Sequence, residues 1–233
     1  MKLILVLTIG HLIGDFLFQT EKIVLWKQKE LKGIVFHGII VALAMGLVLL
    51  PFYPQLYWLV AIQGLFHILI DWGKIKISFP IPGQELISFL LDQFMHLGVI
   101  LGSVYFLVAT ERELQPVQEI SETLLYIITA YLVATVFAAI FLQVIVNQIF
   151  PQPRKQPFLF WQSRFTGLIE RILVTTSILS SSFFLLIIGF LITPAAYYFK
   201  YLQQEERRRI WCRYIFSLSW AVLIALTLKL IIY

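Results

Sequence analysis

The chain has a single cysteine, Cys212, among its 233 residues. One thiol excludes an internal disulfide and any metal site built from several thiolates, so a metal would take nitrogen and oxygen ligands. Charged residues are also scarce, at 13% of the chain, while hydrophobic residues reach 60%. Soluble domains typically have an apolar share of about 45–50%. The composition therefore excludes a soluble globule and indicates a polytopic membrane protein.

The few charges are unevenly distributed along the chain. The formal net charge is +5, and the basic residues fall in short loops between apolar runs. This pattern sets the orientation of a membrane protein, so we expect membrane lipids as partners and no nucleic acid. Lys2 and the apolar run after it resemble a signal peptide, but His11 and Asp15 interrupt that run and no A-x-A site follows. We expect the first segment to be a retained helix.

Six hydrophobic runs are about as long as a bilayer core requires. They are Leu3–Gln19, Ile34–Pro51, Leu56–Trp72, Leu86–Ala109, Thr123–Phe150 and Trp211–Ile232. The stretch Phe165–Tyr198 is too long for one ordinary span and short for two. The predicted fold is an all-α, polytopic transmembrane helical bundle of about seven or eight segments. We predict one integral-membrane domain, residues 1–233, with a four-helix half at 1–110 and a less specific helical half at 121–233.

Alternate loops carry the positive charge, which predicts that they face the cytoplasm. These loops contain Lys22, Lys27, Lys29 and Lys32; then Lys74 and Lys76; then Arg154, Lys155 and Arg164; and finally Lys200 with Arg207, Arg208, Arg209 and Arg213. The last group is cytoplasmic only if Phe165–Tyr198 forms a helical hairpin. Eight segments with both termini outside satisfy the rule, whereas a seven-segment form breaks it once. The expected location is a cell membrane (inner or plasma membrane), crossed several times.

Histidine and aspartate pairs interrupt the apolar runs. Each of the three aspartates lies four residues from a histidine, in the pairs His11/Asp15, His67/Asp71 and Asp92/His96. Residues four apart share one face of a helix, where they can bind one metal or exchange a proton. Such side chains are costly inside a membrane, so a cluster of them is by default a functional-site hypothesis.

The order of each pair follows the direction of its helix. His11/Asp15 and His67/Asp71 belong to segments predicted to run toward the cytoplasm, and Asp92/His96 belongs to one predicted to run away from it. This places every aspartate nearer the cytoplasm than its histidine. At about 1.5 Å per residue, these side chains and His37 fall within roughly the inner 15 Å of the membrane. One shared depth across four helices favours a single convergent site.

The residue types predict a centre for one or two divalent metals, with zinc, manganese and iron all suitable. We assign His11, His37, His67, Asp92 and His96 as metal ligands, and Asp15 or Asp71 as general base. Auxiliary residues are Gln19, Gln93, Glu170 and Arg171. In the alternative interpretation, each His/Asp pair is a structural hydrogen bond between helices.

Several motifs resemble one family of bacterial membrane proteins. "HLIGDFLFQT" at 11–20, the isolated His37, "FHILIDW" at 66–72, "LLDQFMHL" at 90–97 and "GLIERIL" at 167–173 resemble domain of unknown function 3307. The resemblance is strongest over residues 1–100. It implies motif positions at His11, Asp15, Gln19, His37, His67, Asp71, Asp92, Gln93, His96, Gly167, Glu170 and Arg171. "AAYYFKYL" and "CRYIFSLS" in the later part depart from the family pattern.

The setting is also similar, in residue types alone, to membrane-bound metal-dependent hydrolases. The leading hypothesis is a hydrolase acting from the cytoplasmic side on a lipid-linked or amphipathic substrate, which Lys74, Lys76, Arg154 and Lys155 would gather at the surface. A transporter of divalent cations or protons is the second hypothesis, although the outer helix halves are almost wholly apolar. A scaffold with structural His/Asp pairs is the third.

Overall fold

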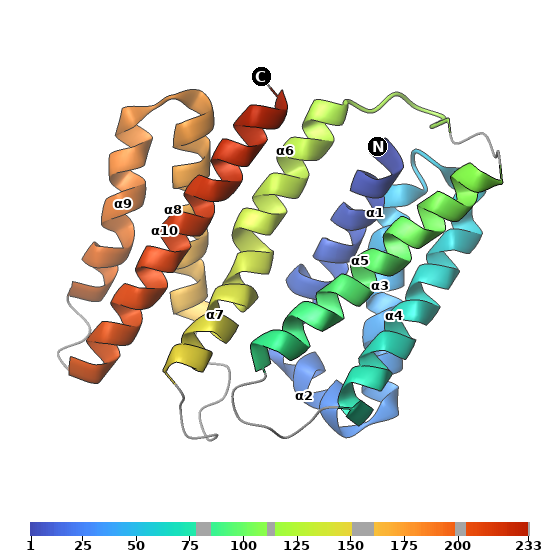
Figure 1. The fold of residues 1–233 in the computed structure, drawn as a ribbon, viewed down its shortest axis with the longest axis horizontal. Coiled ribbons are helices and arrows are strands. Elements are labelled where there is room, and N and C mark those ends of the chain that lie inside the picture. Colours follow the sequence, from blue (N-terminus) through green and yellow to red (C-terminus); the bar gives the residue numbers. More distant parts are fainter. Residues whose placement is uncertain (78–84, 111–114, 151–160, 199–203, 233) are drawn as a thin grey trace. The chain divides into compact units, whose positions relative to one another are not determined.

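The computed structural model describes residues 1–77, 85–110, 115–150, 161–198 and 204–232 (Figure 1). Throughout these ranges the regular structure is helical, without strands, as predicted. The α-helices are α1 (Lys2–Leu12), α2 (Glu21–Lys29), α3 (Leu31–Leu49), α4 (Tyr57–Ile77), α5 (Glu85–Ala109), α6 (Glu122–Leu132), α7 (Ala138–Ile149), α8 (Trp161–Ser180), α9 (Phe183–Tyr198) and α10 (Gln204–Ile232). Two π-helical turns, η1 (Ile13–Leu17) and η3 (Val133–Phe137), and a 3₁₀ turn, η2 (Pro54–Leu56), complete them.

The chain divides into two compact units, Met1–Thr129 and Ala130–Tyr233, with the boundary inside α6. We call them the N-terminal and C-terminal units. The prediction of one integral-membrane domain over 1–233 is not tested by this division and stays a prediction.

Five stretches of the described chain are long and apolar enough to cross a membrane, which identifies a membrane protein. They are Leu31–Leu49, Pro54–Lys76, Glu85–Ala109, Glu122–Ile149 and Arg208–Ile232. A sixth is reached if α1, η1 and α2 count as one broken span. The described residues thus support five or six spans where the sequence predicts seven or eight. The difference lies in the pair α8 and α9: α8 is not among these stretches, and in the described part of α9 the apolar stretch is Phe183–Ile192, which is shorter than a span.

The stretch Phe165–Tyr198 lies in two helices that pack against each other, α8 and α9 (Figure 1). The turn between them uses Ser181, whose φ of 55° lies in the left-handed region. The Ser182 N–H donates to the Ser177 carbonyl at 2.9 Å, which closes the end of α8. The predicted hairpin is therefore present, while the two membrane crossings it implies stay a prediction. Of the residues that oriented it, Arg154, Lys155 and Lys200 lie outside the described chain.

In the N-terminal unit, α1, α3, α4 and α5 form a closed ring of contacts: α1 packs on α3, α3 on α4, α4 on α5, and α5 on α1 (Figure 1). Glycines bring α1 and η1 very close to α3. A Cβ at Gly14 would lie 2.7 Å from the Val41 Cα, and one at Gly10 would lie 2.6 Å from the Met45 Cα. Small residues at membrane-helix interfaces allow this close backbone approach. The approach presses His11 and Asp15 against α3.

The first predicted segment, Leu3–Gln19, is wrong at its C-terminal end. The helix widens into η1, where the Phe18 N–H donates to the Ile13 carbonyl five residues earlier, at 3.0 Å. A new helix, α2, starts after Thr20, whose side chain accepts from the Ile23 N–H, and it is bent by 87° from the first. Gln19 is consequently in the link between two helices, because the polar run after Phe18 cannot continue an apolar span.

Other helices extend beyond their predicted apolar runs. Helix α3 begins at Leu31, α4 continues to Ile77, and α10 begins at Gln204. Hydropathy marks the part of a helix that suits hydrocarbon, whereas backbone hydrogen bonds continue into the polar boundary layer. The predicted bounds of Leu86–Ala109 and Thr123–Phe150 agree with α5 and with α6–η3–α7 to within a residue.

Candidate metal centre

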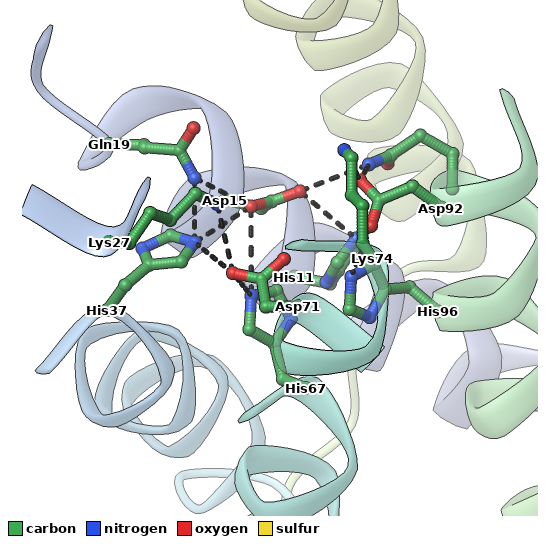
Figure 2. Close-up of polar contacts among 11 residues, drawn as sticks. His11, Asp15, Gln19, Lys27, His37, His67, Asp71, Lys74, Asp92 and His96 are labelled. Carbon is green, nitrogen blue, oxygen red and sulfur yellow. Dashed lines mark hydrogen bonds and ion pairs between the residues drawn. The ribbon is translucent and has the colours of Figure 1, made fainter. Parts of the chain in front are cut away.

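The seven His and Asp residues of the N-terminal unit meet at the centre of its helix ring (Figure 2). Each helix of the ring supplies part of the set, and η1 supplies one aspartate. All seven side chains are buried, with exposed fractions between 0% and 7%. They are His11 from α1, Asp15 from η1, His37 from α3, His67 and Asp71 from α4, and Asp92 and His96 from α5.

The four imidazoles are in mutual contact. The rings of His67 and His96 stack, with centroids 4.2 Å apart, and the His11 ring lies 5.0 Å from His96 and 5.6 Å from His67. His37 is 5.0 Å from His67. One ligand atom from each of His11, His67 and His96 can be chosen so that all three lie within 4.8 Å of one another. Asp15, His37 and His67 meet the same criterion, as do Asp71, Asp92 and His96.

Several atoms of this cluster have no hydrogen-bond partner within the described part of the chain. They are Nε2 of His11 and His96, both ring nitrogens of His67, Nδ1 of His37 and Oδ1 of Asp92. The pairs spaced four apart do not satisfy them, because the shortest such distance, His96 Nε2 to Asp92 Oδ1, is 3.6 Å. Leaving a buried polar atom unsatisfied costs about 1–3 kcal/mol. Imidazole nitrogen and carboxylate oxygen are ordinary ligands of zinc, manganese and iron, so the residues present fit a divalent metal.

Asp15 is the most connected residue of the cluster. Its Oδ1 accepts from Gln19 Nε2 at 3.1 Å and lies 3.0 Å from His37 Nε2, and its Oδ2 accepts from Gln93 Nε2 at 3.2 Å. Gln19 Nε2 is also 2.7 Å from His37 Nε2. The structure thus brings both predicted auxiliary glutamines into the cluster. The wider turn of η1 sets the direction of Asp15, and π-helical turns are frequent at functional sites.

Two lysines complete the cluster, and the sequence analysis missed their part in it. Lys27 Nζ donates to Asp71 Oδ2 at 2.9 Å, and Lys74 Nζ donates to Asp92 Oδ2 at 2.8 Å (Figure 2). Lys74 follows Asp71 by three residues on α4, so the spacing alone could have predicted that Lys74 lies near the cluster. Lys27 is 44 residues from its partner and reaches it only because α2 turns by 87°. No local pattern indicates that contact.

On the opposite side of the cluster from the lysines, the ring is filled by apolar side chains. Leu7, Leu49, Leu59 and Leu107, one from each helix of the ring, are fully buried. The polar contacts at this level include Gln63 Nε2 donating to Ser103 Oγ at 2.8 Å, while Ser103 Oγ donates to the Ile100 carbonyl at 2.8 Å. The lysine side differs, since Gln19, Lys27, Lys74 and Gln93 are all partly exposed.

Glu170 and Arg171 belong to the C-terminal unit and are buried there, each 1% exposed. Arg171 donates from one terminal nitrogen to Ser217 Oγ of α10 at 3.1 Å and from the other to the Thr135 carbonyl of η3 at 3.2 Å. These contacts tie three elements of one unit together. The auxiliary role predicted for Glu170 and Arg171 is not tested by them and stays a prediction.

A family model described as "Protein of unknown function (DUF3307)" matches residues 3–126, more than half of the chain. The matched region contains all seven His and Asp residues, both glutamines and both lysines of the cluster. No curated protein and no solved structure matches the chain. Any activity must therefore be argued from the site itself.

Proposed function

The chain belongs to the DUF3307 family, which carries no assigned activity, and from its site we propose that it is an integral-membrane, metal-dependent hydrolase. The supporting observation is the convergence of three buried imidazoles whose Nε2 atoms have no hydrogen-bond partner in the described chain. A merely structural cluster would gain stability by satisfying or replacing these atoms. We propose a lipid-linked or amphipathic substrate, reached from the cytoplasmic face of a bacterial inner membrane.

His11, His67 and His96, together with Asp92 Oδ1, would hold the first metal, and His37 and Asp15 border a second position that shares His67. Zinc, manganese or iron, when bound, would supply Lewis-acid activation of water and of the scissile group. The protein's own contribution is to orient the imidazoles. The bonds of Asp15 to Gln19, Gln93 and His37 serve this end, because second-layer hydrogen bonds hold ligand side chains in place.

Asp71 suits the part of general base better than Asp15. Both oxygens of Asp15 accept hydrogen bonds, whereas the recorded contacts of Asp71, to Lys27, His37 and His67, all use Oδ2. Its other oxygen is on the same buried carboxylate and can accept a proton from water. A general base must be held within hydrogen-bond reach of the proton that it takes. Before substrate binds, the Lys27 bond holds Asp71 in place.

The apolar filling opposite the lysines favours an enzyme over a transporter. A transporter requires a polar path on both sides of its site. The described ring carries fully buried Leu7, Leu49, Leu59 and Leu107 on one side and partly exposed polar residues on the other. The site thus opens toward one membrane face. Under the positive-inside rule, the lysine-rich α2 would put that face in the cytoplasm, in an arrangement where α8 and α9 supply the sixth and seventh of eight crossings.

Metal content of the detergent-purified protein tests the proposal, measured by plasma mass spectrometry after reconstitution with zinc or manganese. We expect near-stoichiometric metal in the wild type and its loss in His67→Ala and His96→Ala. Gln63→Ala is the matched control, because Gln63 is buried one turn before His67 on α4 and bonds Ser103 instead. Folded wild-type protein that binds no metal would contradict the proposal.

A hydrolase screen with lipid phosphates and lipid-linked substrates follows on the metal-loaded protein. Asp71→Asn should retain the metal and lose activity by about hundredfold or more, as expected when a general base is removed. Equal activity in Asp71→Asn and wild type would contradict its assignment as base.

A further inference from the structure

Lys27 and Lys74 share one feature that distinguishes them from the other lysines of the N-terminal unit: each places its ammonium on a buried aspartate of the cluster. Figure 2 shows Lys27 on the His37 side and Lys74 on the Asp92 side, so that they flank the cluster. Their side chains are 13% and 31% exposed, against 3% and 6% for their aspartates. Both lysines therefore lie between the buried centre and the open face.

The charge balance of the cluster changes sign when a metal binds. Three carboxylates and two ammonium groups leave one net negative charge while the imidazoles are neutral. One divalent ion converts this into a net positive charge, and a second ion adds two more. Uncompensated charge inside a membrane is costly. A metal-loaded cluster consequently attracts an anion, and the open face is where one can enter.

We propose that Lys27 and Lys74 are the anion-binding pair of this site and that they take a phosphate group of the substrate. The inference rests on the proposed function and narrows its substrate class to phosphate-bearing molecules. The positive charge of a metal held by Asp92 and His96 would offset the negative charge of Asp92 and of nearby Asp71, which weakens their hold on the two ammonium groups. Each lysine has a flexible four-carbon stem and three rotatable donors, so it can turn from its aspartate to an oxyanion.

The donors near this face suit a tetrahedral oxyanion. Gln19 and Gln93 bring amide N–H groups to Asp15, between the two lysines, and both glutamines are partly exposed. Two cations and two amides around one position can satisfy the several oxygens of a phosphate. Helix α2, which carries Lys27, leaves the first helix at 87° and ends in Lys29. A basic helix in this orientation lies along the headgroup layer, where lipid phosphates are found.

The test is isothermal titration of inorganic phosphate into full-length, manganese-loaded protein. Lys27→Gln and Lys74→Gln keep a donor for the aspartate but remove the charge. Lys29→Gln and Lys32→Gln are matched controls, because both are exposed lysines of the N-terminal unit and Lys29 lies two residues beyond Lys27 on the same helix. We expect the two test variants to keep their manganese and to weaken phosphate binding by about tenfold or more, since a charged hydrogen bond contributes about 1.5–3 kcal/mol. The controls and the Lys27→Arg and Lys74→Arg variants should bind like wild type.

Two outcomes would overturn the inference. Unchanged phosphate binding in both test variants would leave the lysines as counter-ions of the aspartates only, with the metal site intact. If phosphate binding weakens equally in the test and control variants, the effect comes from general surface charge and not from the two lysines of the cluster. A wild type that binds neither manganese nor zinc would instead overturn the proposed function, and the metal assay separates that result from the others. If Lys27→Gln does not fold, the more exposed Lys74 still provides the test.

The source of the phosphate is resolved by repeating the titration in nanodiscs of phosphatidylcholine with and without phosphatidic acid. Competition by phosphatidic acid that is lost in Lys74→Gln assigns the site to a lipid headgroup. Lysine-dependent phosphate binding without that competition assigns it to a soluble phosphate compound. Both results retain the anion-binding pair.

Discussion

The N-terminal and C-terminal units both bury charged residues, but the groups that they gather differ in kind. The N-terminal unit gathers imidazoles and carboxylates, which bind cations, at one centre. The C-terminal unit buries the guanidinium of Arg171 next to Glu170 and binds it to Ser217 and Thr135. A guanidinium has only donors and stays charged, so it repels a metal. Buried polar groups can thus serve different roles: they form a candidate ligand site in one unit and hydrogen bonds between helices in the other.

Each unit also uses a π-helical turn, and again the use differs. In η1 the turn directs the Asp15 side chain into the His/Asp cluster. In η3 the turn presents backbone carbonyls: Thr135 accepts from Arg171, and Val133 accepts from the Trp220 indole at 3.1 Å. A π-helical turn interrupts the regular backbone hydrogen bonds and leaves carbonyl groups available. In η3, the long side chains of Arg171 and Trp220 donate to these carbonyls.

The largest effect on stability is expected in the C-terminal unit. Arg171→Met removes the bonds to Ser217 and Thr135 and a buried positive charge next to Glu170, which should lower the free energy of unfolding by about 3–5 kcal/mol. Unfolding titration with sodium dodecyl sulfate measures it, with exposed Arg208→Met as control. Metal content per folded molecule should not change. Loss of metal from folded Arg171→Met would contradict the view that metal binding is a property of the N-terminal unit alone.

Metal binding should stabilise the protein through the N-terminal unit alone. At a free metal concentration about a hundred times the Kd, the wild type should gain about 2.7 kcal/mol. His11→Ala should lose this gain, because a ligand is missing, whereas Thr175→Ala in the C-terminal unit should keep it. Unfolding in zinc or manganese against chelator measures the difference. An equal gain in His11→Ala would place the metal elsewhere.

The close approach of α1 to α3 gives a prediction of intermediate size. Gly14→Ala places a Cβ 2.7 Å from the Val41 Cα, so the helices must separate, and we expect a loss of about 1–3 kcal/mol with weaker metal binding. Gly98→Ala is the matched control, since a Cβ there meets nothing within 4 Å. If the two variants unfold alike, helix contact at Gly14 does not hold the site together.

The smallest effect is a gain. His67 has both ring nitrogens buried without a hydrogen-bond partner in the described chain. In chelator, His67→Leu should therefore raise the free energy of unfolding by about 1 kcal/mol, while it abolishes metal binding. The comparable change in the C-terminal unit, Arg171→Met, should only destabilise. Destabilisation of metal-free His67→Leu would indicate a structural histidine.

Much of the site follows from spacing and hydropathy. Pairs such as His67/Asp71 are four apart in apolar runs, and the alternation of helix direction puts them at one depth, which is sufficient to predict that they meet. Gln93 is adjacent to Asp92, so its presence also follows. Gln19, which the sequence places at the end of the first helical segment, instead bonds Asp15 from the link between η1 and α2.

The helical class, the apolar spans and the identity of the buried His and Asp residues were set by local chemistry, since each depends on neighbours within a few turns. The unpartnered imidazole nitrogens, the glycine contact between α1 and α3 and the hold of Lys27 on Asp71 depend on residues tens of positions apart. One bend of 87° after η1 decides whether Lys27 meets the cluster or the solvent. Such a bend arises from packing and capping together, and no periodic pattern in the sequence encodes it.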